Sequence, residues 1–106
     1  MREIKFRTWD KRFKNMIYSG AMAILYLNDK DHEIMQFTGL LDRNKKEIWE
    51  GDIVTFHLGR DYKGTIEWSD DESGFQIMPY FRWLTPRLEI EVIGNIYQNP
   101  ELLEDK

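Results

Sequence analysis

The chain has 106 residues, no cysteine and a formal net charge of −4. This length fits one domain that buries roughly two-thirds of its unfolded surface, enough for a core without covalent staples. The lack of cysteine excludes disulfides and thiolate metal sites and is compatible with a reducing cytoplasm. No apolar run approaches the roughly 20 residues of a membrane helix, and residues 1–5 lack the apolar core of a signal peptide. We therefore expect a cytoplasmic protein without membrane contact.

The charge is distributed unevenly along the chain. Residues 1–14 hold six basic and two acidic residues, whereas residues 89–106 hold five acidic residues and one basic residue. These opposite ends are either solvated faces or neighbouring strands of one fold, or they meet head-to-tail between subunits. The negative total opposes non-specific binding to nucleic acid phosphates.

The first third of the chain predicts short strands and one ambiguous segment. Residues 4–7 alternate apolar and basic side chains, which indicates a strand with one face of each kind. Residues 10–15 are polar enough to turn the chain, and residues 16–18 are the return strand. Residues 20–27 are apolar throughout, and periodicity does not separate a buried strand from a short helix at this length, although Tyr26 and its β-forming neighbours favour a strand.

The clearest succession of strands and turns lies in the centre of the chain. Residues 35–38 alternate as a half-buried strand does, and Gly39 is expected to close it. Residues 42–47 have no apolar anchor and predict an exposed connection. Glu50-Gly51-Asp52 is a tight turn whose glycine can adopt a positive φ, and the β-branched and aromatic run at residues 53–56 predicts the strand that follows.

The last third predicts a hairpin and a final strand. Residues 64–68 and 75–78 alternate on either side of a turn cluster, and Pro79 indicates a strand end or edge. Residues 89–97 form the last long strand, with a bulge or close approach at Gly94. A single helical turn is then expected near the C-terminus, where Asn99 suits the N-cap and the following proline the first helical position. Short strands separated by Gly and Pro residues predict a mostly antiparallel barrel or sandwich.

Four blocks spanning nearly the whole chain resemble the YopX-like proteins of phages and prophages. They are Lys5–Asp10, Met35–Leu40 with Asp42, Ile48–Val54, and Ile93–Tyr97 with Asn99–Leu103. The resemblance implies a mainly β fold: an SH3-like small barrel (35–106) with a β-rich N-terminal extension (1–34), in a single domain that ends in a short helical turn. It implies a bacterial host cytoplasm as the location and supplies no activity, cofactor or catalytic residue to carry over. Residues 60–88 match no motif, so we look for partner specificity there.

The two histidines do not predict a metal site. His32 and His57 have no ligand spacing with carboxylates such as Asp31 or Asp52. We therefore interpret His32 as a residue of a surface loop and His57 as the end of a strand.

No catalytic signature is present. Glu50 and Asp52 flank a glycine like paired acid–base carboxylates, but such a pair needs one desolvated carboxyl, and a tight turn is normally wet. The acidic segment 70–74 fails the calcium-loop template, because placing its glycine at the sixth position puts Ser69 and Tyr80 where acidic ligands belong. There is no cysteine nucleophile, glycine-rich phosphate loop or supported Ser-His-Asp grouping. We therefore expect a protein that is not an enzyme and has no metal or cofactor.

Aromatic residues are the most informative remaining feature, at 14% of the chain. Four of them gather near two arginines: Trp68, Tyr80, Phe81 and Trp83, with Arg82 and Arg87. One interpretation places all four in the core of a small barrel. However, the adjacent residues 80–83 cannot all face inward on a strand, and protein interfaces and single-strand-binding platforms both place aromatics beside arginines. The candidate partner-binding residues are Trp68, Tyr80, Arg82, Trp83 and Arg87.

Two functions are favoured as hypotheses, and an enzyme, which would need a closed pocket with convergent polar groups from several strands, is the least favoured class. The first is a non-enzymatic phage accessory protein that acts as a protein-interaction module, as a homo-oligomer or with an unknown protein partner. The alternative is a small nucleic-acid-binding barrel that uses the basic N-terminal hairpin, with Lys5, Arg7 and Arg12, and the region 82–87.

Overall fold

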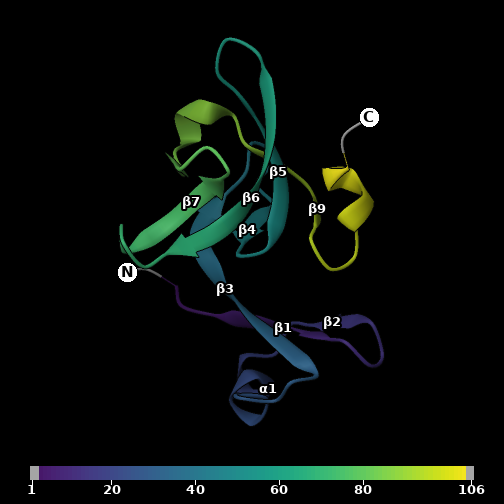
Figure 1. The fold of residues 1–106 in the computed structure, drawn as a ribbon. Helices are drawn as coiled ribbons and strands as arrows, with labels where there is room; N and C mark the ends of the chain where they lie inside the picture. The colour runs from purple at the N-terminus through teal and green to yellow at the C-terminus, as the bar shows by residue number, and fades with distance from the viewer. Residues whose placement is uncertain (1–2, 105–106) are drawn as a thin grey trace.

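The computed structural model describes residues 3–104 as a mainly β fold of two antiparallel sheets, in which one sheet is curled into a half-barrel (Figure 1). The strand order is β2-β1-β3-β4 in the first sheet and β8-β7-β6-β5-β9 in the second. The elements are β1 (Phe6–Asp10), β2 (Asn15–Ile17), α1 (Gly20–Leu25), β3 (His32–Leu41), β4 (Glu47–Trp49), β5 (Asp52–His57), β6 (Asp61–Ser69), β7 (Gly74–Met78), β8 (Arg82–Trp83), the 3₁₀ helix η1 (Pro86–Leu88), β9 (Glu91–Asn95) and the 3₁₀ helix η2 (Pro100–Leu103). Three residues of the charged ends, Arg2, Asp105 and Lys106, lie outside the described part.

The long strand β3 connects the N-terminal hairpin to the rest of the molecule. It pairs with β1 over residues 32–36 and with β4 over residues 37–41. The expected end at Gly39 is therefore wrong, because the strand continues through this glycine at a φ of +89° beside a register shift. A boundary between residues 34 and 35 falls inside this strand.

The main core lies between the curled sheet and the segments that cross it. Its buried side chains come from strands β4, β5, β6, β7 and β9 and from the η1 region: Ile48, Val54, Phe56, Ile66, Ile77, Leu88, Ile90 and Val92. Ile66 and Ile77 face each other across the β6–β7 pair, and both are fully buried. The alternation in these two strands therefore predicts the buried positions of Ile66 and Ile77.

Strand β1 departs from its predicted alternation. The sequence predicts a strand over residues 4–7 with an apolar and a basic face, whereas β1 covers residues 6–10, and its residues Arg7, Thr8, Trp9 and Asp10 are all buried. The reason is that α1 contacts β1 from one side of the first sheet, while the second sheet lies on the other (Figure 1). A strand covered on both faces no longer shows a period of two. The ambiguous apolar segment forms the short helix α1 over residues 20–25, so the preference for a strand is wrong.

The C-terminal region holds a close-packed turn and a short 3₁₀ helix. Strand β9 shifts register between its pairs with Ile53 and Val54, and a Cβ at Gly94 would lie 2.6 Å from Oδ1 of Asn99, which confirms the expected bulge and close approach. Asn99 occupies the predicted N-cap position of η2, but its side chain does not cap the helix. Its Oδ1 instead accepts a hydrogen bond from the Asn95 amide. Within residues 3–104, no helix is long and apolar enough to cross a membrane.

Candidate functional site

A groove between strand β3 and the β6–β7–β8 sheet edge carries two exposed tryptophans. We call it the tryptophan groove; its volume is about 320 Å³ and it is lined by Gln36, Thr38, Leu40, Trp68, Ser73, Gly74, Phe75, Trp83 and Leu84. The polar lining comes mainly from β3 and the β6–β7 turn, and the apolar lining from the large side chains. One sheet therefore presents two indole rings to the same hollow.

Local contacts fix the orientation of both rings. Trp68 lies opposite Phe75 in the hairpin register, and the two rings meet edge-to-face at a centroid distance of 5.1 Å. The Trp68 indole Nε1 also donates a hydrogen bond of 2.7 Å to Asp70 Oδ1. Trp83 packs directly over Gly74, where any Cβ would overlap its ring. The glycine is thus required by the close approach of an aromatic ring.

The interpretation that placed the four clustered aromatics in the core is wrong. The exposed fraction is 46% for Trp68, 41% for Tyr80, 68% for Phe81 and 49% for Trp83. The physical reason is that aliphatic side chains from the middle of β6 and β7 already fill the core. The hairpin ends and the two-residue strand β8 extend beyond that core, so their aromatic residues remain at the surface.

The five candidate partner-binding residues do not form one cluster. Trp68 and Trp83 line the tryptophan groove, but Tyr80 packs edge-to-face against Phe56 and Tyr62 beside a different hollow. Arg82 and Arg87 are exposed and line neither hollow. Sequence reasoning missed the β3 side of the groove, although the alternation of Gln36 and Thr38 with buried neighbours was its signal.

An acidic turn borders the tryptophan groove. The β6–β7 turn supplies Ser73 to the lining, next to Gly74 at the start of β7, and it also carries the exposed residues Asp70, Asp71 and Glu72. Three neighbouring carboxylates give this end of the groove a negative potential, which favours a partner with positive charge beside its apolar contact.

A second unusual region is the ion pair between the two sheets. Arg7 of β1 donates a hydrogen bond of 2.8 Å to Asp52 Oδ1 on β5, and both side chains are only 3% exposed. Asp52 Oδ2 accepts the Trp49 amide at 2.8 Å, and the Arg7 guanidinium lies 5.2 Å from the centroid of a Trp49 ring. The expectation of a wet Glu50-Gly51-Asp52 turn is therefore wrong for Asp52.

Burial sets the electrostatics of this inter-sheet pair. It raises the pKa of Asp52, and the Arg7 charge offsets part of that effect. Burial also raises the pKa of Glu50, whose Oε1 accepts the Gln36 amide at 3.1 Å. The two carboxyl groups therefore hold different backbone and side-chain partners, and their contacts join strands rather than form an acid–base pair.

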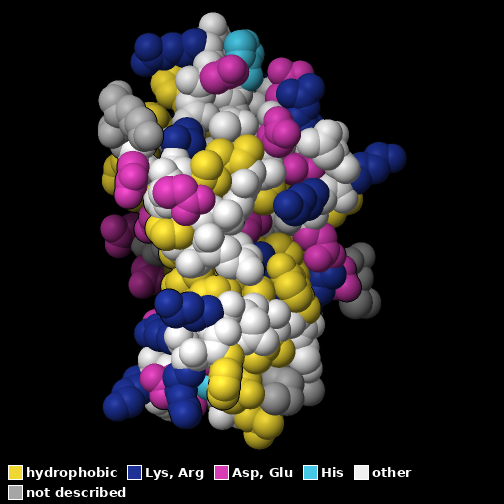
Figure 2. Space-filling model, turned by 90° about the vertical axis from the view of Figure 1, so that its right-hand side faces the viewer, with side chains coloured by type: hydrophobic (Ala, Val, Ile, Leu, Met, Phe, Trp, Pro, Cys, Tyr) yellow, Lys and Arg dark blue, Asp and Glu magenta, His cyan; other side chains and the backbone are white. Residues whose placement is uncertain are grey.

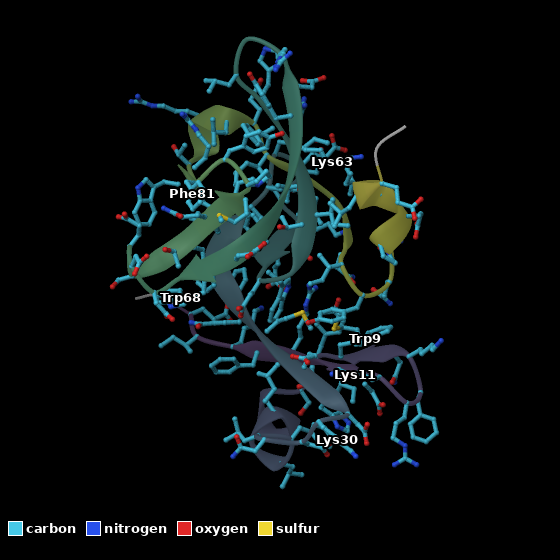
Figure 3. The ribbon with its side chains drawn as sticks, viewed as in Figure 1. Trp9, Lys11, Lys30, Lys63, Trp68 and Phe81 are labelled. Carbon is cyan, nitrogen blue, oxygen red and sulfur yellow. The ribbon has the colours of Figure 1, made fainter. Side chains whose placement is uncertain are left out.

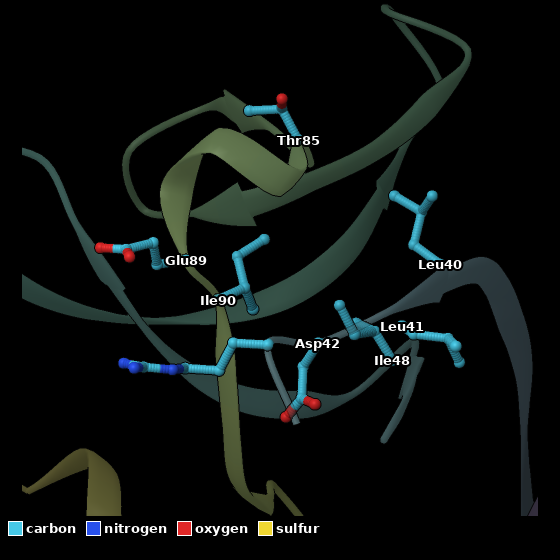
Figure 4. A pocket seen from close by; sticks show the side chains of 8 residues that line it. Leu40, Leu41, Asp42, Ile48, Thr85, Glu89 and Ile90 are labelled. Carbon is cyan, nitrogen blue, oxygen red and sulfur yellow. The ribbon is translucent and has the colours of Figure 1, made fainter. Parts of the chain in front are cut away.

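Asp42 is a buried carboxylate in a stretch that was expected to be exposed. Its Oδ1 accepts the amides of Asn44 and Lys46, and its Oδ2 accepts the Val92 amide at 2.9 Å. Burial raises the pKa of Asp42, but these N–H donors outweigh it, and the net pKa lies below the ordinary value of 3.8. The adjoining hollow, shown in Figure 4, is only about 80 Å³, so Asp42 anchors a turn rather than lining a large site.

The histidines take separate structural positions. His57 ends β5 as predicted, and its Nδ1 lies 3.0 Å from Asp61 Oδ1 at the surface. His32 was expected in a surface loop, but it begins β3, is only 10% exposed at the side chain and stacks on Tyr26. Its Nε2 lies 3.4 Å from Asp10 Oδ2. Among residues 3–104, no group of three or more His, Asp or Glu side chains could hold a metal.

The cations of the nucleic-acid hypothesis are largely engaged within the protein. Lys5 forms an ion pair with Glu47, and Arg7 is buried against Asp52. Arg12 alone of the three is exposed, at the tip of the β1–β2 hairpin. The hairpin therefore offers less free positive charge than its sequence suggests.

Comparison with known proteins agrees with the fold described above. The crystal structure of protein EF1440 from Enterococcus faecalis superposes with a TM-score of 0.73 at 25% sequence identity, covering 98% of this chain and 100% of that chain. No curated protein matches the sequence. The model of the YopX protein family matches residues 25–104, which is well over half of the chain. The chain belongs to the YopX family.

Proposed function

We propose that this protein is a non-enzymatic protein-interaction module that binds a partner through the tryptophan groove. The observation that carries the proposal is the pair of half-exposed indole rings, Trp68 and Trp83, which line one groove at the edge of a sheet. Tryptophan is the side chain most often found at the energetic centre of protein interfaces, because its burial removes a large apolar area from water. Leaving two of them uncovered in one groove is unfavourable unless a partner covers them.

The charges near the groove favour a protein over a nucleic acid. The acidic turn with Asp70, Asp71 and Glu72 repels phosphates, and the net charge is −4. Of the basic residues once considered for nucleic acid, Lys5 and Arg7 already pair with carboxylates. A nucleic-acid-binding role remains the alternative, and it predicts salt-dependent binding that is lost when Arg12, Arg82 and Arg87 are neutralised.

The finer assignments follow the family resemblance. We propose an SH3-type barrel over residues 35–106, preceded by an N-terminal extension over residues 1–34, in a phage or prophage accessory protein of the host cytoplasm. Supporting this are the curled sheet and the match to the YopX family. The lack of any catalytic motif in the sequence supports a role in binding rather than catalysis.

Site-specific photo-crosslinking in bacteria tests the proposed function. A photoreactive phenylalanine analogue at position 83 is expected to give discrete protein adducts, whereas the same analogue at Tyr80, exposed on the other side, is expected to give few. Trp68→Ala in the position-83 protein should remove the adducts. Equal labelling from positions 83 and 80, or adducts that persist without Trp68, would contradict a role of the groove in binding.

A further inference from the structure

The tip of the β1–β2 hairpin projects an aromatic side chain between two positive charges. Phe13 is 75% exposed, the highest value among the large hydrophobic side chains whose exposure the structure describes. Arg12 and Lys14 flank it and are both exposed. The Arg12 guanidinium lies 5.8 Å from the Phe13 ring centroid, so positive charge and apolar surface lie side by side.

This tip is an ordered turn. Asp10 Oδ1 accepts the amides of Arg12 at 2.9 Å and Phe13 at 3.1 Å, and the Lys14 amide donates to the Asp10 carbonyl at 2.8 Å. These hydrogen bonds lower the pKa of the Asp10 carboxyl, chiefly through the Phe13 amide. The turn therefore fixes the backbone that presents Phe13 to solvent, which reduces the backbone entropy lost when a partner covers the side chain.

The tip and the tryptophan groove are complementary in three respects. An exposed phenylalanine matches a hollow of about 320 Å³ rimmed by two indoles and Phe75. The cations Arg12 and Lys14 match the acidic turn at residues 70–72. Both are presented by hairpins whose geometry is fixed before contact.

One chain cannot make this contact with itself. The β1–β2 hairpin turns at the lower right of Figure 1, whereas the end of the β6–β7 hairpin lies at the left. Figure 3 shows Trp68 and Lys11 on these opposite sides. In the view of Figure 2, which faces the hairpin side, Lys and Arg side chains project near hydrophobic ones at the lower end of the molecule.

We propose that the Arg12-Phe13-Lys14 tip of one copy docks into the tryptophan groove of a second copy. Phe13 inserts between Trp68 and Trp83, and the two cations lie against Asp70, Asp71 and Glu72. This inference rests on the proposed function, since it names the occupant of the same groove. The contact is heterologous: each joined pair still has one free tip and one free groove, so further copies add in a ring or a row.

Sedimentation velocity over a range of protein concentrations tests the proposal. The unaltered protein is expected to associate as concentration rises, and less so at 1 M salt, where charge pairs are screened. Phe13→Ser and Trp83→Ala should each weaken association at least tenfold, because each removes one half of the contact. Leu25→Ser is the matched control, since Leu25 is also an exposed apolar residue, at 71%, but lies outside both surfaces.

Mixing the two weakened variants gives the decisive result. Phe13→Ser keeps an intact groove and Trp83→Ala keeps an intact tip, so the mixture is expected to form a 1:1 complex that goes no further. Circular dichroism of each variant checks that both remain folded, as expected for substitutions of exposed side chains. Self-association that survives Phe13→Ser, or a mixture that stays monomeric, overturns the inference.

The failure of this inference is distinguishable from failure of the proposed function. If the protein stays monomeric at all concentrations but crosslinks from position 83 to another protein, the groove binds a partner and the second copy is the wrong occupant. If there is neither self-association nor a crosslink that requires Trp68, both proposals fail. A position-83 adduct that maps to residues 11–15 of the same chain supports both.

Discussion

The inter-sheet ion pair and the tryptophan groove are both exceptions to the rule that charged side chains lie at the surface and large apolar ones in the core. Arg7 and Asp52 carry charges into the interior, whereas Trp68 and Trp83 carry large apolar rings to the surface. Arg7 and Asp52 bind each other within the chain, whereas a hollow remains open beside Trp68 and Trp83. The contrast separates a feature that holds the two sheets together from one available for binding.

The two regions should therefore respond differently to substitution. Removing a member of the buried ion pair leaves an uncompensated charge, and the cost appears in folding. Removing an exposed tryptophan leaves the core intact, and the cost appears in association.

Asp52→Asn is expected to lower the free energy of unfolding by about 3–5 kcal/mol, because Arg7 would be left buried without a countercharge. Urea unfolding followed by circular dichroism measures the change. Asp61→Asn is the control, since its pair with His57 is exposed and its loss should cost less than about 1 kcal/mol. Similar midpoints for the two variants would show that Arg7–Asp52 does not hold the sheets together.

Asp42→Asn is expected to cost about 2 kcal/mol at pH 7, since hydrogen bonds from three backbone amides to a charged acceptor are weakened. The folded-state pKa of Asp42 lies below its ordinary value of 3.8, so its stabilisation is complete above that value and is lost as pH falls through the folded pKa. Denaturation between pH 7 and pH 2 should therefore show a shallower acid loss in the variant. Parallel curves would contradict this role for the carboxylate.

Gly74→Ala is expected to move the Trp83 ring, since the added Cβ would overlap it, at a cost of about 1–3 kcal/mol. The variant should also lose binding in the tryptophan groove. Iodide quenching of indole fluorescence reports the displaced ring. Gly20→Ala is the control, because nothing lies within 4 Å of its added Cβ. An unchanged quenching curve for Gly74→Ala would mean that Trp83 does not pack on this glycine.

Trp68→Ala is expected to change stability by no more than about 1 kcal/mol, because the ring is nearly half exposed and the core is filled without it. Ile66→Ala, two residues earlier on β6 and fully buried, is the matched comparison and should cost about 2–5 kcal/mol. Thermal unfolding of both variants measures the difference. If Trp68→Ala costs as much as Ile66→Ala, the tryptophan belongs to the core rather than to a binding surface.

Local patterns predicted those parts of the fold that depend on neighbours in sequence. The β6–β7 hairpin and the bulge at Gly94 follow from alternation and from the position of glycine. The inter-sheet ion pair was missed because Arg7 and Asp52 lie 45 residues apart, and the sequence around each residue gives no sign of its partner. Asp42 was missed for the same reason, since its contact with the Val92 amide spans 50 residues.

The candidate site was predicted in part. Trp68 and Trp83 were named from the density of aromatics, and they share a groove. Tyr80 was grouped with them by proximity in sequence, but the chain reverses before β8 and places it on another surface. The residues that β3 adds to the groove lining depend on how the two sheets pack together, and local sequence patterns do not predict that packing.

The course of β3 determines how the chain can be divided. Its first half belongs to the pairing with β1 and its second half to the pairing with β4, and the bonds of one continuous backbone join them. A cut between residues 34 and 35 would leave each fragment with half a strand, and would separate Arg7 from Asp52. Limited proteolysis should therefore not cleave the folded protein between residues 34 and 35. The N-terminal and C-terminal parts should also unfold in a single cooperative step.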